Sequence, residues 1–593
     1  MRFGRSTAEA RERITAREQA RRAMTTEPQG GRELKGSRAG KSAPDYALRV
    51  FPGAFNTTSK RQVTSARTYT CPSPTIATSA CAPGSIFGGR SGSDLNRRRH
   101  SAMRERVNIT HGFSLLVAAL LVLSSGCATR PINPPITKVD PATGYRFETR
   151  QGNIEDKENL VILAFSGGGT RAAAFSYGVL EFLRKTEVVG PKGNKGSLLD
   201  SVNIITGVSG GSFTALAYGL YGDRLFADYE QRFLKRDVQG EITARFLNPT
   251  YWGALWSTGW GRSELAAQLY DEILFNGATF GDLTRAGGPL ILASATDIST
   301  GSRFLFTQSI FDIICSDLGA VPLSRAAAAS SAVPVVLTPV TFNNYGGTCN
   351  RVPPAWVKPF VTSDDPPRPA ARAIRSLKAE EAFGDGVRRP YLHLVDGGVS
   401  DNLGMRGMLD VLEIFQALHE AGMPTPLDHV RRIIVVIVNS LSTPPTTWDE
   451  SESPPGSVQV LLKSAGTPID AFSFEAVELL RDTAKLWQTA RLIRNSAAMA
   501  ANKDPAVAAA LRVPDAEIYA IDVSFAALKD QAEREYLNQL PTSFVLPSES
   551  VDRLRAAAAT LIMDSPEFKR LLNDVGVRVI AEPPAAGSPA AAQ

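Results

Sequence analysis

The sequence predicts an α/β fold built around a mainly parallel sheet. Two segments each show a short apolar run, a glycine-rich turn and a helical pattern, which is the order of strand, loop and helix in such folds. Further apolar runs of strand length follow at Pro289 to Ala295, Arg303 to Thr307 and Arg432 to Val438. The 593 residues are 43% hydrophobic and 21% charged, so the chain can bury a sizeable core.

Positive charge is concentrated in residues 1–102, which show no sustained helix or strand period. This leader carries a net charge of +12, whereas the whole chain carries +6, so the remainder stands at −6. An acidic body argues against a nucleic-acid partner. The composition of the leader predicts no packed core. A second plausible start follows at Met103, and a signal sequence there could not easily work behind a basic leader of 102 residues. We therefore expect residues 1–102 to come from an upstream start that the cell does not use.

Residues 103–126 have the pattern of a bacterial signal peptide. Met103 opens a short charged region, and Gly112 to Leu123 is an apolar run too short for a spanning helix. The following Ser-Ser-Gly-Cys resembles a lipobox, in which Cys127 would be lipidated and become the mature N-terminus. A hydrophobic membrane anchor or an unrelated apolar segment is the alternative. The expected location is the bacterial cell envelope, with the protein lipid-anchored at the periplasmic face of the outer membrane.

The remaining body contains two cysteines, Cys315 and Cys349. Export past the reducing cytosol would permit one disulfide between them, and two buried free thiols are the alternative. The chain has no CxxC pair, HExxH motif or EF-hand loop. We therefore predict neither a metal site nor a cofactor.

The chain divides into segments by composition. Residues 127–159 contain several prolines and are predicted to form an extended tether. A catalytic domain is expected over 160–448, with a proline-rich surface insertion at 343–390. The segment 449–593 is predicted to be a helical C-terminal cap around one strand, Ile518 to Val523, ending in a loose tail.

The first strand, Leu160 to Phe165, leads directly into a glycine-rich loop. The loop reads Ser166-Gly167-Gly168-Gly169-Thr170-Arg171, and an alanine-rich helical stretch follows it. Backbone N–H groups of such a loop can converge at a helix N-terminus, where the helix dipole favours negative charge.

The second unit places a serine on its turn. The strand Val202 to Thr206 is followed by Gly207-Val208-Ser209-Gly210-Gly211 and by a helix, Phe213 to Tyr221. The small residues at 207, 210 and 211 allow the sharp elbow that presents a serine hydroxyl. An ordinary glycine-rich turn is the other interpretation.

A serine nucleophile needs a base within hydrogen-bond reach. In an open parallel sheet the site gathers at the carboxyl ends of the strands. His419 and His429 precede the strand Arg432 to Val438, so they are predicted at the wrong edge, and His393 lies inside a strand. Asp396, followed by Gly397 and Gly398, ends that strand and is the better candidate base.

These three blocks together resemble the patatin-like phospholipase family. The family combines a G-G-G-x-[RK] loop, a G-x-S-x-G elbow and a D-G-[GA] motif in this order, and the resemblance covers Leu160 to Asn439. It implies a three-layer α/β/α fold and a lipid acyl hydrolase of phospholipase A or lysophospholipase type. Ser209 and Asp396 would form the catalytic dyad, and Gly167, Gly168, Gly169, Thr170 and Arg171 the oxyanion hole. Ala172 and Ser166 depart from common members, which bears on substrate preference.

Other interpretations of these motifs remain. A noncatalytic envelope lipoprotein would keep the fold without the chemistry, and a Ser-His-Asp esterase would need one of the three histidines. The Arg171 side chain either braces its loop or contacts an anionic head group. Trp252, Trp256 and Trp260 would share one helix face, either in the core or at a lipid interface.

Overall fold

The computed structural model describes residues 130–150, 158–189, 195–255, 257, 260–354, 357–362, 371–444, 446–500 and 504–581. All of them belong to one compact unit, Ser93–Gln593. The leader, the signal segment and Cys127 lie outside the described residues.

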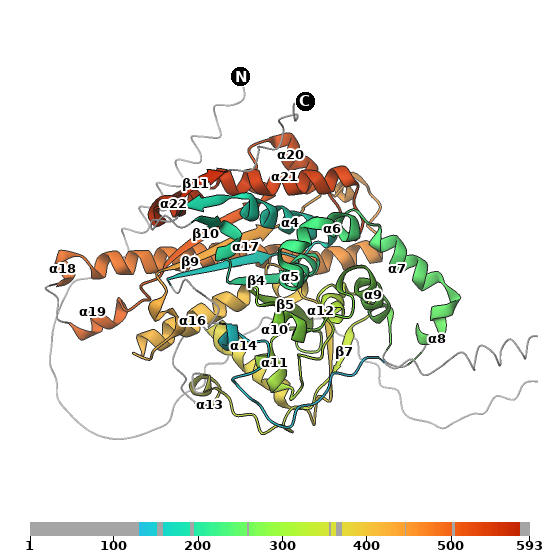
Figure 1. Ribbon diagram of the computed structural model, residues 1–593, viewed down its shortest axis with the longest axis horizontal. Coiled ribbons are helices and arrows are strands. Elements are labelled where there is room, and N and C mark those ends of the chain that lie inside the picture. The colour runs from blue at the N-terminus through green and yellow to red at the C-terminus, as the bar shows by residue number, and fades with distance from the viewer. Residues whose placement is uncertain are drawn as a thin grey trace, which may run out of the picture. The chain divides into compact units, whose positions relative to one another are not determined.

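A central sheet organises the described part of the chain (Figure 1). Five neighbouring strands run parallel in the order β10-β9-β1-β4-β5, and the antiparallel strands β8 and β7 continue the sheet, with β6 paired to β5. The sheet is therefore mainly parallel. Its strands are β1 (Asn159–Phe165), β4 (Ile204–Val208), β5 (Leu290–Asp297), β6 (Ser302–Leu305), β7 (Val340–Asn343), β8 (Tyr391–Asp396), β9 (Arg432–Asn439) and β10 (Glu517–Ser524).

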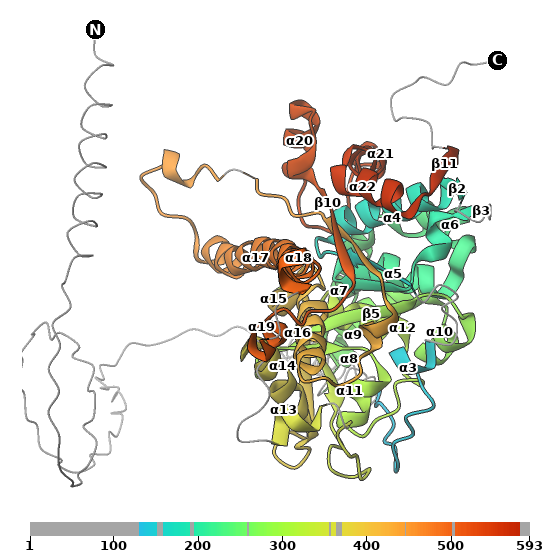
Figure 2. The ribbon, with the colours of Figure 1, turned by 90° about the vertical axis from the view of Figure 1, so that its left-hand side faces the viewer.

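Helices cover both faces of this sheet. Figure 2 shows α17 (Ser457–Arg494) and α21 (Ser548–Asp564) on opposite sides of β10, and both helices contact that strand. Helix α21 also packs along α4 (Gly169–Lys185), which follows β1. The result is a three-layer α/β/α arrangement, as the resemblance implies.

The observed direction of β8 differs from the predicted one. The sequence pattern leads us to expect the carboxyl end of β8 at the same edge as the carboxyl ends of the parallel strands. β8 runs antiparallel to β5 and pairs only with its last residues, Ala295 to Asp297. It therefore enters from beyond the carboxyl edge of the parallel strands and runs back toward them. Asp396, its last residue, pairs with Ala295, one residue beyond the Ser294 that pairs with Val208 of β4. The carboxylate thus reaches the carboxyl edge by a different path.

The C-terminal segment is more than a cap. β10 extends the parallel sheet beside β9 over eight residue pairs, from Glu517↔Arg432 to Ser524↔Asn439. Ile521 and Val523 of β10 and Leu554 of α21 belong to the same hydrophobic core as β1 and β4. Residues 517–564 are therefore part of the same α/β fold as β1 and β4.

The segment predicted as a tether is fixed to the body over its described residues. The Asn133 side chain donates to Ser316 Oγ at 2.8 Å, and the buried Tyr145 hydroxyl accepts a hydrogen bond from Ile291 N at 2.7 Å. Arg146 forms a buried ion pair with Asp312 at 2.8 Å. The prolines do keep much of the segment extended, but these contacts hold residues 130–150 in place, with a short helix at α3 (Phe147–Arg150).

The proline-rich insertion contains folded elements. Two helices, α13 (Lys358–Thr362) and α14 (Ala371–Glu381), pack with α16 (Arg406–Glu420) around a second small hydrophobic core. At its root, a disulfide joins Cys315 to Cys349, with their Cα atoms 5.5 Å apart.

Shorter elements complete the fold. They are α5 (Gly210–Tyr221), α6 (Leu225–Tyr229), α7 (Val238–Leu247), α8 (Trp252–Leu255), α9 (Arg262–Tyr270), α10 (Phe280–Ala286), α11 (Gln308–Ile313), α12 (Leu323–Ser330), α15 (Gly398–Asp401), α18 (Ala497–Ala500), α19 (Pro505–Ala510), α20 (Gln531–Asn538) and α22 (Pro566–Val575), together with a small antiparallel sheet of β2 (Glu187–Val189), β3 (Lys195–Ser197) and β11 (Arg578–Ala581).

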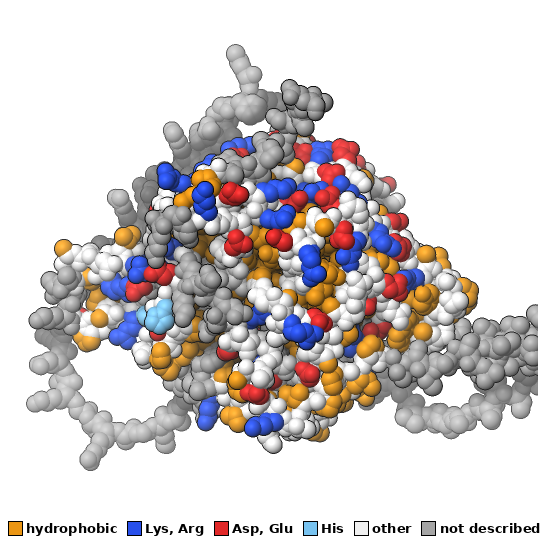
Figure 3. Space-filling view, in the orientation of Figure 1, with side chains coloured by type: hydrophobic (Ala, Val, Ile, Leu, Met, Phe, Trp, Pro, Cys, Tyr) orange, Lys and Arg blue, Asp and Glu red, His pale blue; other side chains and the backbone are white. Residues whose placement is uncertain are grey.

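The predicted tryptophan stripe does not form. Helix α8 ends at Leu255, so Trp252 and Trp260 do not share a helix face, and Trp256 lies outside the described residues. Trp260 is buried, whereas Trp252 is 44% exposed near Phe246 and Leu247. Hydrophobic side chains show at this end of the molecule in Figure 3. Among the described residues, no helix combines the length and apolarity needed to cross a membrane.

Candidate active site

Ser209 stands on a strained turn between β4 and α5. Its φ of 48° lies in the left-handed region, which a non-glycine residue adopts at a cost. The next residue must be glycine, because a Cβ on Gly210 would lie 2.0 Å from the carbonyl oxygen of Gly169. A Cβ on Gly211 would lie 2.6 Å from Ser166 O. The elbow and the glycine-rich loop are therefore packed directly against each other.

The Ser209 hydroxyl donates a hydrogen bond to Asp396 Oδ2 at 2.8 Å. The other carboxylate oxygen, Oδ1, accepts from Gly398 N at 2.8 Å, so the carboxylate is oriented by its own glycine motif. Burial raises the pKa of Asp396 to about 6, and the hydrogen bonds from Gly398 and Ser209 oppose this rise. The group is then ionised at neutral pH and still more basic than an ordinary aspartate, which suits a general base.

The histidines of the body lie elsewhere. His393 is on the exposed face of β8, where its Nδ1 lies 3.0 Å from Thr341 Oγ1. His419 Nδ1 lies 3.6 Å from Asp428 Oδ1, just before the amino end of β9. His429 ends the short 3₁₀ turn that leads into the same strand. The partner of the Ser209 hydroxyl is a carboxylate.

Only part of the glycine-rich loop is free to donate hydrogen bonds. Gly167 N already donates to Asn402 O at 2.9 Å, and Thr170 N to Ser543 O at 2.8 Å. Gly168 N and Gly169 N have no acceptor among the described residues. They stand at the N-terminus of α4, where the helix dipole favours an anion. Among the three glycines of the predicted oxyanion hole, Gly168 and Gly169 are therefore the candidate backbone donors.

The Arg171 side chain is hydrogen-bonded within the protein. Its guanidinium is buried and donates to Ser440 O at 2.7 Å, Leu540 O at 2.6 Å and Thr542 Oγ1 at 3.1 Å. Burial lowers its pKa to about 10, so it remains cationic at neutral pH. Because these donors are used inside the protein, the geometry fits a side chain that braces the glycine-rich loop. It does not fit one that contacts an anionic head group.

The acceptors of Arg171 belong to a segment that the sequence analysis did not connect with the site. Residues 540–545, here called the C-terminal strap, lie across the glycine-rich loop. Ser543 O approaches so closely that a Cβ on Gly169 would be 2.3 Å from it. Phe544 packs on Phe213 of α5 and on Tyr270 of α9. Because 369 residues separate Arg171 from Leu540, no local pattern could have indicated this contact.

Two further serines support the site. Ser330, which ends α12, accepts a hydrogen bond from Ser209 N at 2.9 Å through its hydroxyl, and its carbonyl accepts from Gly397 N at 3.0 Å. Ser440, which follows β9, donates from its hydroxyl to Gly167 O at 3.0 Å. One serine fixes the elbow and the aspartate motif, and the other fixes the glycine-rich loop.

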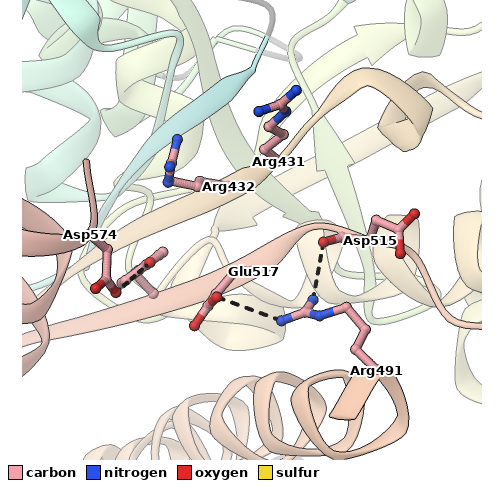
Figure 4. Close-up of a pocket in the computed structure, with 7 residues that line it drawn as sticks. Arg431, Arg432, Arg491, Asp515, Glu517 and Asp574 are labelled. Atoms are coloured by element: carbon pink, nitrogen blue, oxygen red, sulfur yellow. Dashed lines mark hydrogen bonds and ion pairs between the residues drawn. The ribbon is translucent and has the colours of Figure 1, made fainter. Parts of the chain in front are cut away.

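A separate polar pocket lies at the opposite edge of the sheet, at the amino ends of β9 and β10 (Figure 4). Its volume is about 370 Å³. Several of its charged groups interact within the protein, such as Arg491 with Glu517 at 3.8 Å and Asp574 with the Tyr519 hydroxyl at 2.9 Å. It is distinct from the site around Ser209. The lining residues are Arg431, Arg432, Arg491, Asp515, Glu517, Tyr519 and Asp574.

The described residues form a mixed α/β fold with a mainly parallel central sheet, and Ser209 and Asp396 meet at its carboxyl edge. Residues 163–409 match the family model described as patatin-like phospholipase. The chain therefore carries a patatin-like phospholipase domain, and the resemblance seen in the sequence is confirmed. No curated protein sequence matches the chain.

Solved structures that resemble the chain include human GIVD cytosolic phospholipase A2. The protein in complex with methyl gamma-linolenyl fluorophosphonate is 14% identical, with a TM-score of 0.35 over 72% of this chain and 62% of that one. The protein without the inhibitor is 15% identical, with a TM-score of 0.31 over 72% and 65%. VipD from Legionella pneumophila is 10% identical, with a TM-score of 0.24 over 74% and 72%. This chain thus matches less than two thirds of the human protein's length.

Proposed function

We propose that this protein is a serine hydrolase that cleaves carboxylic esters of lipids, as a phospholipase A or lysophospholipase does. The family match supports a lipid hydrolase in general. The observation that carries the finer proposal is the 2.8 Å hydrogen bond from the Ser209 hydroxyl to the buried carboxylate of Asp396.

The proposed reaction uses these groups in sequence. Asp396 accepts the Ser209 proton as Oγ attacks the ester carbonyl, and the carbonyl carbon becomes tetrahedral. Gly168 N and Gly169 N donate to the oxyanion that forms. Asp396 then returns the proton to the leaving alcohol, and water, activated in the same way, releases the fatty acid from Ser209.

The test compares hydrolysis of mixed phospholipid vesicles by the wild type, Ser209→Ala and Asp396→Asn. Both variants should lose the activity while their circular dichroism stays native, since the nucleophile and its base are both required. A fluorophosphonate should label the wild type and not Ser209→Ala. His393→Ala, His419→Ala and His429→Ala serve as controls and should keep their activity. Substantial turnover by Asp396→Asn, or its loss on removing one histidine, would overturn the dyad in favour of the triad alternative. A stable wild type with neither labelling nor turnover would favour the noncatalytic lipoprotein.

We further propose that Cys127 carries a lipid that holds the protein at the bacterial cell envelope. The lipobox-like sequence supports this, and the disulfide between Cys315 and Cys349 is of the kind that forms outside the reducing cytosol. Mass spectrometry of the N-terminal peptide from membranes of the native host is the test. An unmodified Cys127 within a longer peptide would contradict the proposal.

A further inference from the structure

The side chain of Asn402 lies beside the proposed dyad, although no motif of the sequence analysis includes it. A Cβ placed on Gly167 would be 2.5 Å from Asn402 Oδ1 and 3.3 Å from Ser209 Cβ. A Cβ placed on Gly398 would be 3.0 Å from the same Oδ1 and 3.1 Å from Asp396 Oδ1. The carboxamide therefore adjoins the nucleophile, the base and the glycine-rich loop together.

This carboxamide makes no hydrogen bond with any of the residues that the structure describes. It is half-buried, and only its backbone carbonyl is engaged, as the acceptor of Gly167 N at 2.9 Å. A carboxamide offers two N–H donors and one acceptor. Because no partner fixes its orientation, rotation about the last side-chain bond can bring Nδ2 to the point that Oδ1 now occupies.

One N–H of the loop is already used at the place where this amide stands. Gly167 N–H donates to the Asn402 carbonyl, so it is not free to donate to an oxyanion. The same residue can offer a donor there through its side chain. We infer that the Asn402 carboxamide contacts the substrate and donates a hydrogen bond to the ester carbonyl oxygen as it becomes an oxyanion, alongside Gly168 N and Gly169 N. This inference rests on the proposed ester hydrolysis.

The experiment uses the full chain with Asn402→Ala, Asn402→Asp and, as a matched control, Asn203→Ala. Asn203 is also a half-buried asparagine, but it lies at the amino edge of the sheet, where its Oδ1 accepts from Val161 N at 2.7 Å. Asn402→Asp keeps the shape and removes the NH₂ group. Initial rates on phospholipid vesicles and rates of fluorophosphonate labelling are measured, and thermal unfolding reports the fold.

If Asn402 is an oxyanion donor, Asn402→Ala should lower kcat by about 10²-fold or more with KM changed little. Asn402→Asp should be at least as slow, and Asn203→Ala should stay near wild type. Two outcomes overturn the inference while the proposed function stands: Asn402→Ala within about threefold of wild type, or Asn402→Asp restoring the rate that Asn402→Ala loses, since only the shape would then matter. A folded wild type that neither hydrolyses esters nor reacts with the fluorophosphonate overturns the proposed function as well.

Discussion

Asp396 combines two properties that usually exclude each other. It is buried, which disfavours its charge, yet the base proposed for the reaction must be ionised to accept a proton. The two hydrogen bonds it accepts, from Gly398 N and from the Ser209 hydroxyl, offset part of the desolvation. The resulting pKa of about 6 leaves the carboxylate charged at neutral pH but more basic than in water.

This value predicts the pH dependence of ester hydrolysis. Only ionised Asp396 can accept the proton, so kcat/KM should fall about tenfold per pH unit below pH 6 and reach a plateau above pH 7. The measurement is kcat/KM on a soluble short-chain ester from pH 4.5 to 8.5, with a check that the protein stays folded at the acid end. A profile that is flat from pH 4.5 to 7 would show that Asp396 is not the base.

At the residue scale, the sequence could indicate groups that stand in local motifs. Ser209 and Asp396 each lie beside glycines that indicate a sharp turn, and in the structure the two side chains are hydrogen-bonded to each other. Ser330, Ser440 and Asn402 carry no such local signal. Their positions follow from the pairing of strands far apart in the chain, which periodicity cannot predict.

At the element scale, the C-terminal strap binds the glycine-rich loop directly through hydrogen bonds. Ser543 O accepts from Thr170 N at 2.8 Å, and Leu540 O accepts from the Arg171 guanidinium at 2.6 Å. The loop has Gly168 and Gly169 at positive φ, 140° and 62°, so its own backbone does little to favour one conformation. The hydrogen bonds from the strap hold the loop in one conformation.

We therefore predict that Arg171→Met lowers kcat at least tenfold and destabilises the protein, because it removes three bonds that hold the loop and leaves buried acceptors unpaired. Thr542→Val removes one of these acceptors and should have a smaller effect on both. The measurement is vesicle hydrolysis at a temperature where both variants are folded, with neutral and anionic head groups compared.

The head-group comparison distinguishes the two roles considered for Arg171. A brace affects both lipids equally, whereas a head-group contact would cost activity mainly on the anionic one. Folded Arg171→Met with the wild-type kcat would rule out the brace as a positioning element.

The direction of β8 shows what element-level prediction misses. The apolar run Tyr391 to Val395 indicates a strand, but a short run does not reveal whether it pairs parallel or antiparallel. β8 pairs antiparallel with β7 and with Ala295 to Asp297 of β5. This pairing depends on the folded insertion that connects β7 to β8.

At the scale of the whole molecule, the strand-loop-helix order in the sequence was sufficient for the α/β class and the mainly parallel sheet. It was not sufficient for the boundaries of that fold. Residues 130–150 and the segment from β10 to α21 both belong to it, since Tyr145 and Ile521 lie in the same core. The sequence pattern correctly predicts helices in the C-terminal segment. It cannot predict which face of the sheet they cover, because that depends on tertiary packing.

The disulfide lies where three distant parts of the chain meet. Cys315 follows α11, and Cys349 lies in the first part of the insertion. The N-terminal segment binds beside Cys315, where Ile136 N donates to Cys315 O at 2.9 Å and Asp317 N donates to Pro134 O at 3.0 Å. Both cysteines are buried, and their hydrogen bonds are with Ile136, with Asp312 and with each other, away from the motifs around Ser209. The bond therefore bears on the assembly of these parts more than on the chemistry.

We predict that reduction lowers the melting temperature by several degrees and leaves vesicle hydrolysis at low temperature largely intact. Opening a loop of 34 residues restores conformational entropy to the unfolded chain, worth about 3–4 kcal/mol in the chain-entropy model. Differential scanning calorimetry with and without reductant measures the shift. The double variant Cys315→Ala/Cys349→Ala is the control, because its lower melting temperature should not respond to reductant. An unreduced protein that exposes both thiols on unfolding would contradict the prediction, and a loss of hydrolysis in the folded, reduced protein would show that the bond also positions the site.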